Sequence, residues 1–168
     1  MWMDVSKALS FPGQTYPFQA DIEIPPMIVL DDPVSFTDVH GSGEYVGSGS
    51  AVTVRMQITG KVTSQCALCL EPVTEEISCE ADALFKPGAV EGEDDYPLEG
   101  CKIDLLPYVR EALLLELPMR FVCSDDCKGL CPVCGANRNT TRCSCQEGEN
   151  RLNPFSALSE LRIQDEEV

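Results

Sequence analysis

Six of the ten cysteines in this 168-residue chain lie within 23 residues, and this crowding constrains the fold more than any other feature of the sequence. The segment 123–149 that holds them contains almost no large apolar residue, so it cannot build a hydrophobic core of its own. In a reducing compartment, clustered cysteines bind metal or do redox chemistry more often than they form disulfides. We therefore expect a metal ion to fold this segment.

The clustered cysteines are Cys123, Cys127, Cys131, Cys134, Cys143 and Cys145. The central Cys131-Pro-Val-Cys134-Gly135 has the two-residue spacing and trailing glycine of a zinc knuckle, whose turn points both sulfurs at one ion. Because zinc prefers four soft ligands in a tetrahedron, we expect one tightly held zinc ion, bound by these two thiolates and two more from either side. Disulfides, unrelated buried thiols and an iron–sulfur cluster are the alternatives.

A second pair, Cys66 and Cys69, has the same two-residue spacing but lies more than fifty residues before the cluster and lacks the glycine. It is interpreted as a second metal half-site, as a packing or turn element, or as a redox pair. A redox pair requires a helix that begins at its first cysteine, whereas a predicted strand follows here. We therefore expect neither thiol to have a lowered pKa.

Alternating apolar and polar residues predict strands over residues 18–24, 51–59 and 73–85, of which the second is the clearest. Their connections are too short for a parallel crossover, so the sheet is expected to be antiparallel. Two Gly-Ser-Gly repeats make residues 41–49 resemble a linker. His40, the one histidine of the chain, is expected to be solvated in that loop.

Residues 86–100 read as a solvated acidic loop. Asp104 then caps a predicted helix that ends at Leu117, and Asn153 and Pro154 begin a short C-terminal helix. The expected fold class is α+β. An antiparallel sheet or partly closed barrel is packed by one main helix and followed by a zinc-ribbon-like segment and the C-terminal helix.

Two regions follow from this pattern. Residues 1–118 hold the sheet and its covering helix, and residues 119–168 hold the zinc-binding segment, with the C-terminal helix packed on the same core. The longest apolar stretch, 103–117, is interrupted by charges and falls short of the ~18 to 20 residues that a bilayer requires. The first residues lack the features of a signal peptide, which favours the cytoplasm. The oligomeric state cannot be deduced.

The composition argues against an enzyme and against a protein that wraps nucleic acid. The chain has no phosphate-binding loop of the Walker kind and no paired-carboxylate motif that stands out from its acidic background. Twelve Lys and Arg against 28 Asp and Glu give a net charge of −16, which repels a polyanion over most of the surface. We therefore expect a non-catalytic protein.

Charge is nevertheless distributed unevenly. Between Glu71 and Glu99 there are ten acids and the single base Lys86, whereas bases outnumber acids between Cys123 and Cys145. The candidate RNA contacts are Lys128, Arg138, Arg142 and Arg151. The acidic region is a candidate surface for a basic ribosomal protein, and both surfaces are otherwise simply solvated.

An ordered set of motifs resembles the YceD family. They are Cys66-Ala-Leu-Cys69 after a strand, the helix 103–118, Cys127-Lys-Gly-Leu-Cys-Pro-Val-Cys-Gly135 and Asn153-Pro-Phe-Ser-Ala-Leu158. The resemblance spans about residues 60–161 and implies a non-catalytic role in processing, stabilising or assembling 23S ribosomal RNA. The alternative is an acidic module that holds a basic ribosomal protein or recruits a nuclease. Many members of the family lack the later cysteines, which implies that the metal supports the fold.

Overall fold

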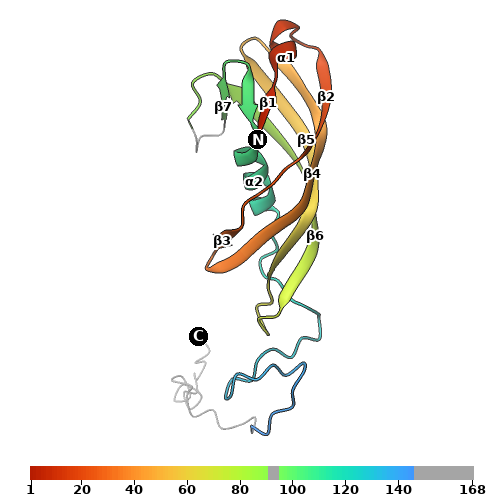
Figure 1. The fold of residues 1–168 in the computed structure, drawn as a ribbon, viewed down its shortest axis with the longest axis vertical. Coiled ribbons are helices and arrows are strands. Elements are labelled where there is room, and N and C mark those ends of the chain that lie inside the picture. Colours follow the sequence, from red (N-terminus) through yellow and green to blue (C-terminus); the bar gives the residue numbers. More distant parts are fainter. Residues whose placement is uncertain (91–94, 146–168) are drawn as a thin grey trace, which may run out of the picture.

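The main element of the computed structural model, which describes residues 1–90 and 95–145, is a long curled sheet (Figure 1). The strands are β1 (Trp2–Asp4), β2 (Thr15–Asp21), β3 (Met27–Val29), β4 (Asp32–Ser48), β5 (Ala51–Gln65), β6 (Pro72–Lys86), β7 (Tyr96–Glu99) and β8 (Lys102–Asp104). Their order is β1-β8-β7-β6-β5-β4-β2, with β3 on β4. All pairs are antiparallel except β6 with β7.

The core lies along one face of the sheet. Alternate residues of β5 are buried there, among them Val54 and Ile58, and Phe85 of β6 is fully buried beside them. Helix α2 (Leu105–Leu115) lies against the curl of the sheet, and the five-residue α1 (Ser6–Ser10) closes its upper end (Figure 1). The molecule is therefore a curled half-barrel of strands with a short helix, and it contains more sheet than the predicted α+β class implies.

The predicted strands all exist, with different bounds. Residues 51–59 and 73–85 fall inside β5 and β6, and β5 continues to Gln65 because Lys61, Val62 and Thr63 pair across both neighbours. The first predicted strand, 18–24, is shifted, since β2 ends at Asp21. The expected loop 86–100 contains β7, which was missed. The predicted C-terminal helix lies outside the described residues.

The prediction of a linker over 41–49 is wrong, because residues 41–48 belong to the 17-residue strand β4 and only Gly49 lies in the turn that follows it. Their glycines are needed for close packing rather than for flexibility. A Cβ atom on Gly43 would lie 2.1 Å from the carbonyl oxygen of Arg55, and one on Gly47 would lie 2.1 Å from that of Ala8 in α1. His40 lies in the same strand, and its Nδ1 is 2.8 Å from Asp21 Oδ1 of β2.

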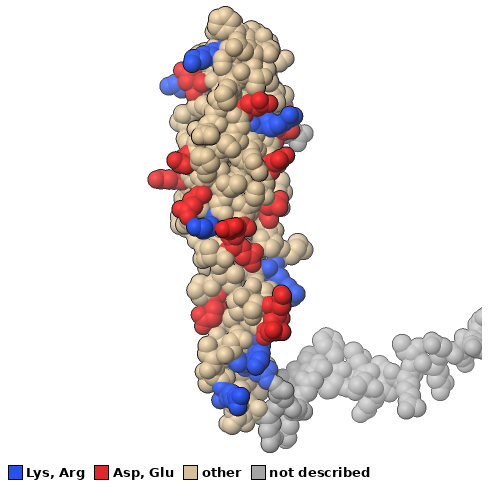
Figure 2. Space-filling model, turned by 90° about the vertical axis from the view of Figure 1, so that its right-hand side faces the viewer, with Lys and Arg blue, Asp and Glu red and all other residues tan. Residues whose placement is uncertain are grey.

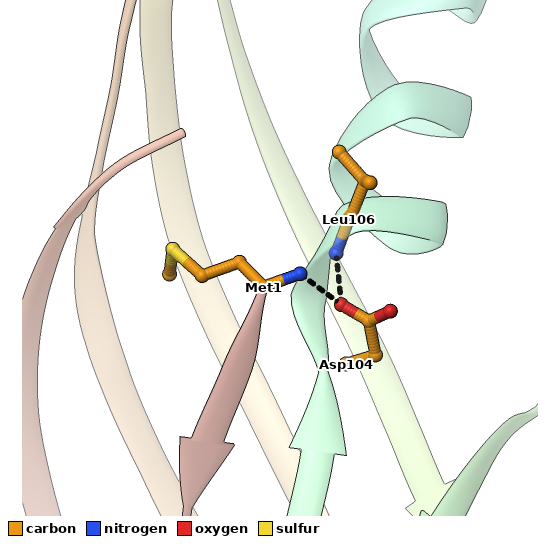
Figure 3. Close-up of polar contacts among 3 residues, drawn as sticks. All are labelled: Met1, Asp104 and Leu106. Carbon is orange, nitrogen blue, oxygen red and sulfur yellow. Dashed lines mark hydrogen bonds and ion pairs between the residues drawn. The ribbon is translucent and has the colours of Figure 1, made fainter. Parts of the chain in front are cut away.

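The start of α2 is fixed by Asp104, as predicted. Its Oδ1 accepts a hydrogen bond of 3.1 Å from the backbone N–H of Leu106, which is the N-cap interaction. The same oxygen forms an ion pair with the amino group of Met1, so one carboxylate joins the N-terminal residue, which precedes β1, to the helix (Figure 3). The helix ends at Leu115, two residues before the predicted end.

Among the described residues, no helix combines the length and apolar character required to cross a membrane.

Candidate metal centres

The structure brings eight cysteines together in two groups of four. The inner centre consists of Cys66, Cys69, Cys123 and Cys127. The outer centre consists of Cys131, Cys134, Cys143 and Cys145. Within each group, the four sulfur atoms all lie within 4.8 Å of one another, as four ligands around one ion must.

The inner centre joins two parts of the chain that are far apart in sequence. Cys66 and Cys69 lie in the turn between β5 and β6, and Cys123 and Cys127 lie beyond α2 (Figure 1). The Sγ atoms of Cys69 and Cys123 are 3.6 Å apart, and those of Cys66 and Cys127 are 3.9 Å apart. This centre therefore connects the tip of the long hairpin to the Cys-rich segment.

Backbone hydrogen bonds hold these two parts in register. The N–H of Ala67 donates to the carbonyl of Phe121, and the N–H of Leu130 donates to the carbonyl of Leu68, each at 2.9 Å. Gly129 allows the second contact, because a Cβ atom there would lie 2.9 Å from the Leu68 carbonyl oxygen. Gly129 also has a positive φ of 66°, which favours glycine.

The outer centre is built within the Cys-rich segment alone. Cys131-Pro-Val-Cys134 forms a tight turn in which the N–H of Gly135 donates to the carbonyl of Cys131 at 2.9 Å. Gly135 has a φ of 72°, as expected for the glycine that follows a zinc knuckle. Cys143 and Cys145 approach this turn from the end of the described segment.

In the inner centre, the pKa of one thiol is strongly lowered and the pKa of another is strongly raised. Burial disfavours the Cys66 thiolate, but N–H groups of Cys123, Leu68 and Cys69 outweigh it and lower the pKa of Cys66 from 9.0 to about 6. The expectation that neither thiol of the 66/69 pair has a lowered pKa is therefore wrong for Cys66. The neighbouring thiols of Cys127 and Cys69, together with burial, raise the pKa of Cys123 to about 12.

The same contrast occurs in the outer centre. The N–H groups of Cys134 and Val133 lower the pKa of Cys131 to about 6, whereas the sulfur of Cys134 and burial raise the pKa of Cys145 to about 12. Like charges this close cannot all ionise in the absence of a cation, so one thiolate forms and a neighbour stays protonated. A divalent cation removes that conflict.

The donor set fits a soft divalent metal. Four thiol sulfurs without an oxygen ligand suit zinc or an iron–sulfur cluster, and hydrogen bonds to two sulfurs supply an outer shell. The N–H of Cys123 donates to Cys66 Sγ at 3.4 Å, and Asn139 Nδ2 donates to Cys127 Sγ at 3.3 Å. Disulfides are not formed, since all ten cysteines are free thiols.

The grouping differs from the single site that the clustered cysteines predicted. Each of the six belongs to one of the two four-thiol groups. Cys123 and Cys127, however, group with Cys66 and Cys69 rather than with the Cys131–Cys134 knuckle. The number of cysteines could have predicted this grouping. A single four-ligand site leaves two of the six clustered thiols unused, whereas these six together with Cys66 and Cys69 fill two four-ligand sites. The two cysteines outside these groups are Cys79, which is half-buried against the core, and Cys101, which is exposed.

A basic hollow of about 560 Å³ adjoins the outer centre. It is lined by Lys128, Arg138, Thr141, Arg142, Cys143 and Cys145. It contains three of the four bases that the sequence singled out, whereas Arg151 lies outside the described residues. On the face drawn in Figure 2, Lys and Arg side chains gather at the lower end, which the Cys-rich segment forms, below a band of acids.

Comparison with known proteins assigns the family. Residues 54–162 match the family model described as "Large ribosomal RNA subunit accumulation protein YceD". The chain belongs to the YceD family. The match begins in β5 and includes all eight cysteines of the two centres, so it covers the whole candidate site.

The relatives carry either the family name or no functional name. The chain is 31% identical over 113 residues to an Arabidopsis thaliana protein named "Large ribosomal RNA subunit accumulation protein YCED homolog 1, chloroplastic"; the match covers 57% of the chain but 35% of that protein. An uncharacterized Mycobacterium bovis protein is 30% identical over 145 residues, 80% of the chain and 69% of the relative. The uncharacterized Bacillus subtilis YlbN is 26% identical over 93% of both chains. No solved structure matches.

Proposed function

We propose that the protein is a non-catalytic factor that supports processing, stability or accumulation of 23S ribosomal RNA and assembly of the large subunit. In this proposal, two zinc ions shape the Cys-rich segment, and its bases contact the phosphates of ribosomal RNA or its precursor. The family to which the chain belongs is described as a large ribosomal RNA subunit accumulation protein, which supports the RNA role. The observation that carries the proposed contact is the basic hollow, which gathers Lys128, Arg138 and Arg142 on a chain whose net charge is −16.

The zinc ions would be held by the inner and outer centres and would supply rigidity rather than reactivity. Each ion would have four thiolate ligands and therefore no open position for water or substrate, which is the arrangement of a structural site. The alternative chemistry, redox exchange by the 66/69 pair, is disfavoured because both thiols are buried. The protein is accordingly proposed to have no enzymatic activity, and its expected cytoplasmic location stays a prediction.

The rival role for the bases of the hollow is to balance the charge of the outer centre. Four thiolates around one Zn²⁺ would carry a net charge of roughly −2, which Lys128, Arg138 and Arg142 would offset from the adjoining wall. A basic residue that only balances the centre should affect metal retention. One that contacts RNA should affect RNA affinity and its dependence on salt. These two roles are therefore separable by experiment.

The test neutralises the hollow with the triple change Lys128→Gln, Arg138→Gln and Arg142→Gln. Binding to a 23S precursor RNA fragment is measured at several salt concentrations. Removing one phosphate contact to single-stranded RNA should lower the slope of log affinity against log salt by ~0.7, so the slope for the triple variant should be smaller by roughly 2. Zinc content should not change.

A matched control neutralises Arg55, Lys61 and Lys102, three bases of the sheet that line no part of the hollow. It changes the net charge by the same amount and should leave the salt slope near that of the unmodified chain. Equal reductions of the slope in the two triple variants would show that only net charge matters. Loss of zinc from the first triple variant would assign these bases to the metal centre instead of RNA.

A further inference from the structure

A second hollow, which none of the cysteines of the two centres lines, lies between α2 and the edge of β6. It has a volume of about 460 Å³ and is walled on one side by Cys79, Glu80, Ala81 and Asp82 of β6. The other walls come from Tyr96 of β7 and from Tyr108, Glu111, Ala112, Leu115 and Glu116 in and just after α2. We call this feature the β6 groove.

The β6 groove exposes the edge of a strand. Strand β6 pairs with β5 along its whole length, but β7 pairs only with its last two residues, Phe85 and Lys86. In the described part of the chain, no strand pairs with the outer edge of β6 from Pro72 to Leu84. Backbone N–H and C=O groups along such an edge are ready to pair with an added strand.

The charge of the β6 groove determines which kind of peptide strand could pair with this edge. Four carboxylates line it, and none of the described residues that line it is Lys or Arg. Asp82 is already engaged, because its Oδ1 lies 2.8 Å from Arg55 Nε. Glu80, Glu111 and Glu116 remain, and the Glu111 carboxylate accepts its 2.6 Å hydrogen bond from the neutral Tyr96 hydroxyl, which leaves its charge uncompensated.

A buried polar group at the same place lacks a partner. Tyr108 is 3% exposed, and its hydroxyl is one of two buried side-chain oxygen atoms without a hydrogen-bond partner in the described residues. Tyr108 itself lines the groove, and its ring centroid lies 5.5 Å from that of Tyr96. Burial and then the nearby Asp82 raise the pKa of Tyr108. An unsatisfied buried hydroxyl costs free energy, and a ligand that supplies a donor or acceptor would relieve that cost.

The rim also offers an apolar contact. Leu115, at the last turn of α2, is 83% exposed although it borders the groove. An open strand edge beside a helix, with carboxylates and one exposed leucine, matches an extended peptide that carries basic and apolar side chains alternately. A second copy of this chain would bring an equally acidic edge. Residues 146–168 of this chain carry six acids and two bases and are repelled as well.

We propose that the β6 groove binds an extended basic segment of a partner protein, which adds to the sheet as a strand beside Cys79–Asp82. The carboxylates on both walls would contact its Lys or Arg side chains, and Leu115 would contact an apolar one. This site is separate from the basic hollow of the proposed function, so either proposal can fail without the other.

The probe is a synthetic capped peptide of alternating Lys and Val, titrated into the full-length protein at physiological salt. Two derivatives carry backbone N-methyl groups, one at every odd residue and one at every even residue. An added strand points alternate N–H groups at β6, so one derivative should bind at least tenfold more weakly and the other should bind like the parent. Their charges are identical, so equal affinities of the two derivatives would overturn the proposal.

The protein side of the experiment uses Glu80→Gln, Glu111→Gln and Glu116→Gln together. Removal of these three exposed charges should weaken binding by about tenfold. The matched control, Glu23→Gln, Asp31→Asn and Asp32→Asn, removes the same charge from residues around β3 that do not line the groove, and it should have little effect. Equal weakening by both variants would overturn the proposal. So would the absence of new amide hydrogen-exchange protection at residues 79–82 when the peptide is added.

Discussion

The sheet and the Cys-rich segment of this protein are held together in different ways. In β5, alternate side chains from Val52 to Ile58 are at most 1% exposed and pack in one core. Between Cys123 and Cys145, the buried positions are Gly129 and Cys131. The first region is stabilised by apolar burial, whereas the second has nothing comparable and brings six thiols into four-sulfur groups instead.

This difference shows how the two regions depend on each other. The inner centre takes two cysteines from the hairpin tip and two from the segment, so the sheet supplies a preformed half of a metal site. The outer centre has no such support and is built from neighbours in sequence. We therefore expect the sheet to fold without metal, and the segment to become ordered only when metal is bound.

The largest effect should follow from metal removal. Chelation should remove protection from amide hydrogen exchange throughout residues 123–145, because structural zinc contributes roughly 10 to 16 kcal/mol in small domains. Amides of β5 should stay protected. If residues 123–145 keep their protection in the metal-free protein, the contrast between the two regions is not real.

A substitution in the hydrophobic core should destabilise the sheet and leave the metal centres intact. Phe85 is fully buried in β6, and Phe85→Ala should lower the free energy of unfolding of the sheet by about 3 to 5 kcal/mol. Denaturant unfolding measures this loss, and metal content at low denaturant should stay unchanged because Phe85 is not in either centre. Leu84→Ala is a neighbouring control on the exposed side, where the loss should be much smaller.

In a plot of the logarithm of zinc affinity against pH, the slope should change near pH 6. Despite burial, the N–H groups of Cys123, Leu68 and Cys69 lower the pKa of Cys66 from 9.0 to about 6, and the last two belong to the β5–β6 turn, which folds with the sheet. The stability from this thiolate is therefore complete above pH 9 and is lost as the pH falls through 6. Below pH 6 the inner centre must release one more proton to bind zinc, and its affinity should fall about tenfold faster per pH unit. Competition with a chromophoric chelator measures this slope. A constant slope from pH 5 to 8 would show that Cys66 is not acidified in the metal-free chain.

The smallest effect concerns the helix N-terminus. Asp104→Ala removes the N-cap bond to Leu106 and the ion pair with Met1, which should cost about 1 kcal/mol of unfolding free energy. Asp104→Asn keeps a capping oxygen and should recover most of that loss. Equal destabilisation by both substitutions would mean that the charge, rather than the cap, is what stabilises this end of α2.

Local patterns predicted those parts of the fold that depend on local chemistry. The alternation in 51–59, the Asp104 cap and the Cys131 knuckle are each decided by a few adjacent residues. The strand β4 was missed because Gly43 and Gly47 are read as flexible, while their purpose depends on Arg55 and Ala8, which only the folded chain brings near. The choice of partners for Cys123 has the same cause, since it depends on where the β5–β6 turn lies.

The metal content of the purified full-length chain tests the central claim most directly. Elemental analysis should find two zinc ions per chain, because the described cysteines form two four-thiol groups. Cys69→Ser and Cys134→Ser should each reduce this to one, and Cys101→Ser, which lies outside both groups, should leave two. One zinc ion in the unmodified chain that Cys69→Ser leaves in place, or iron in place of zinc, would contradict the account.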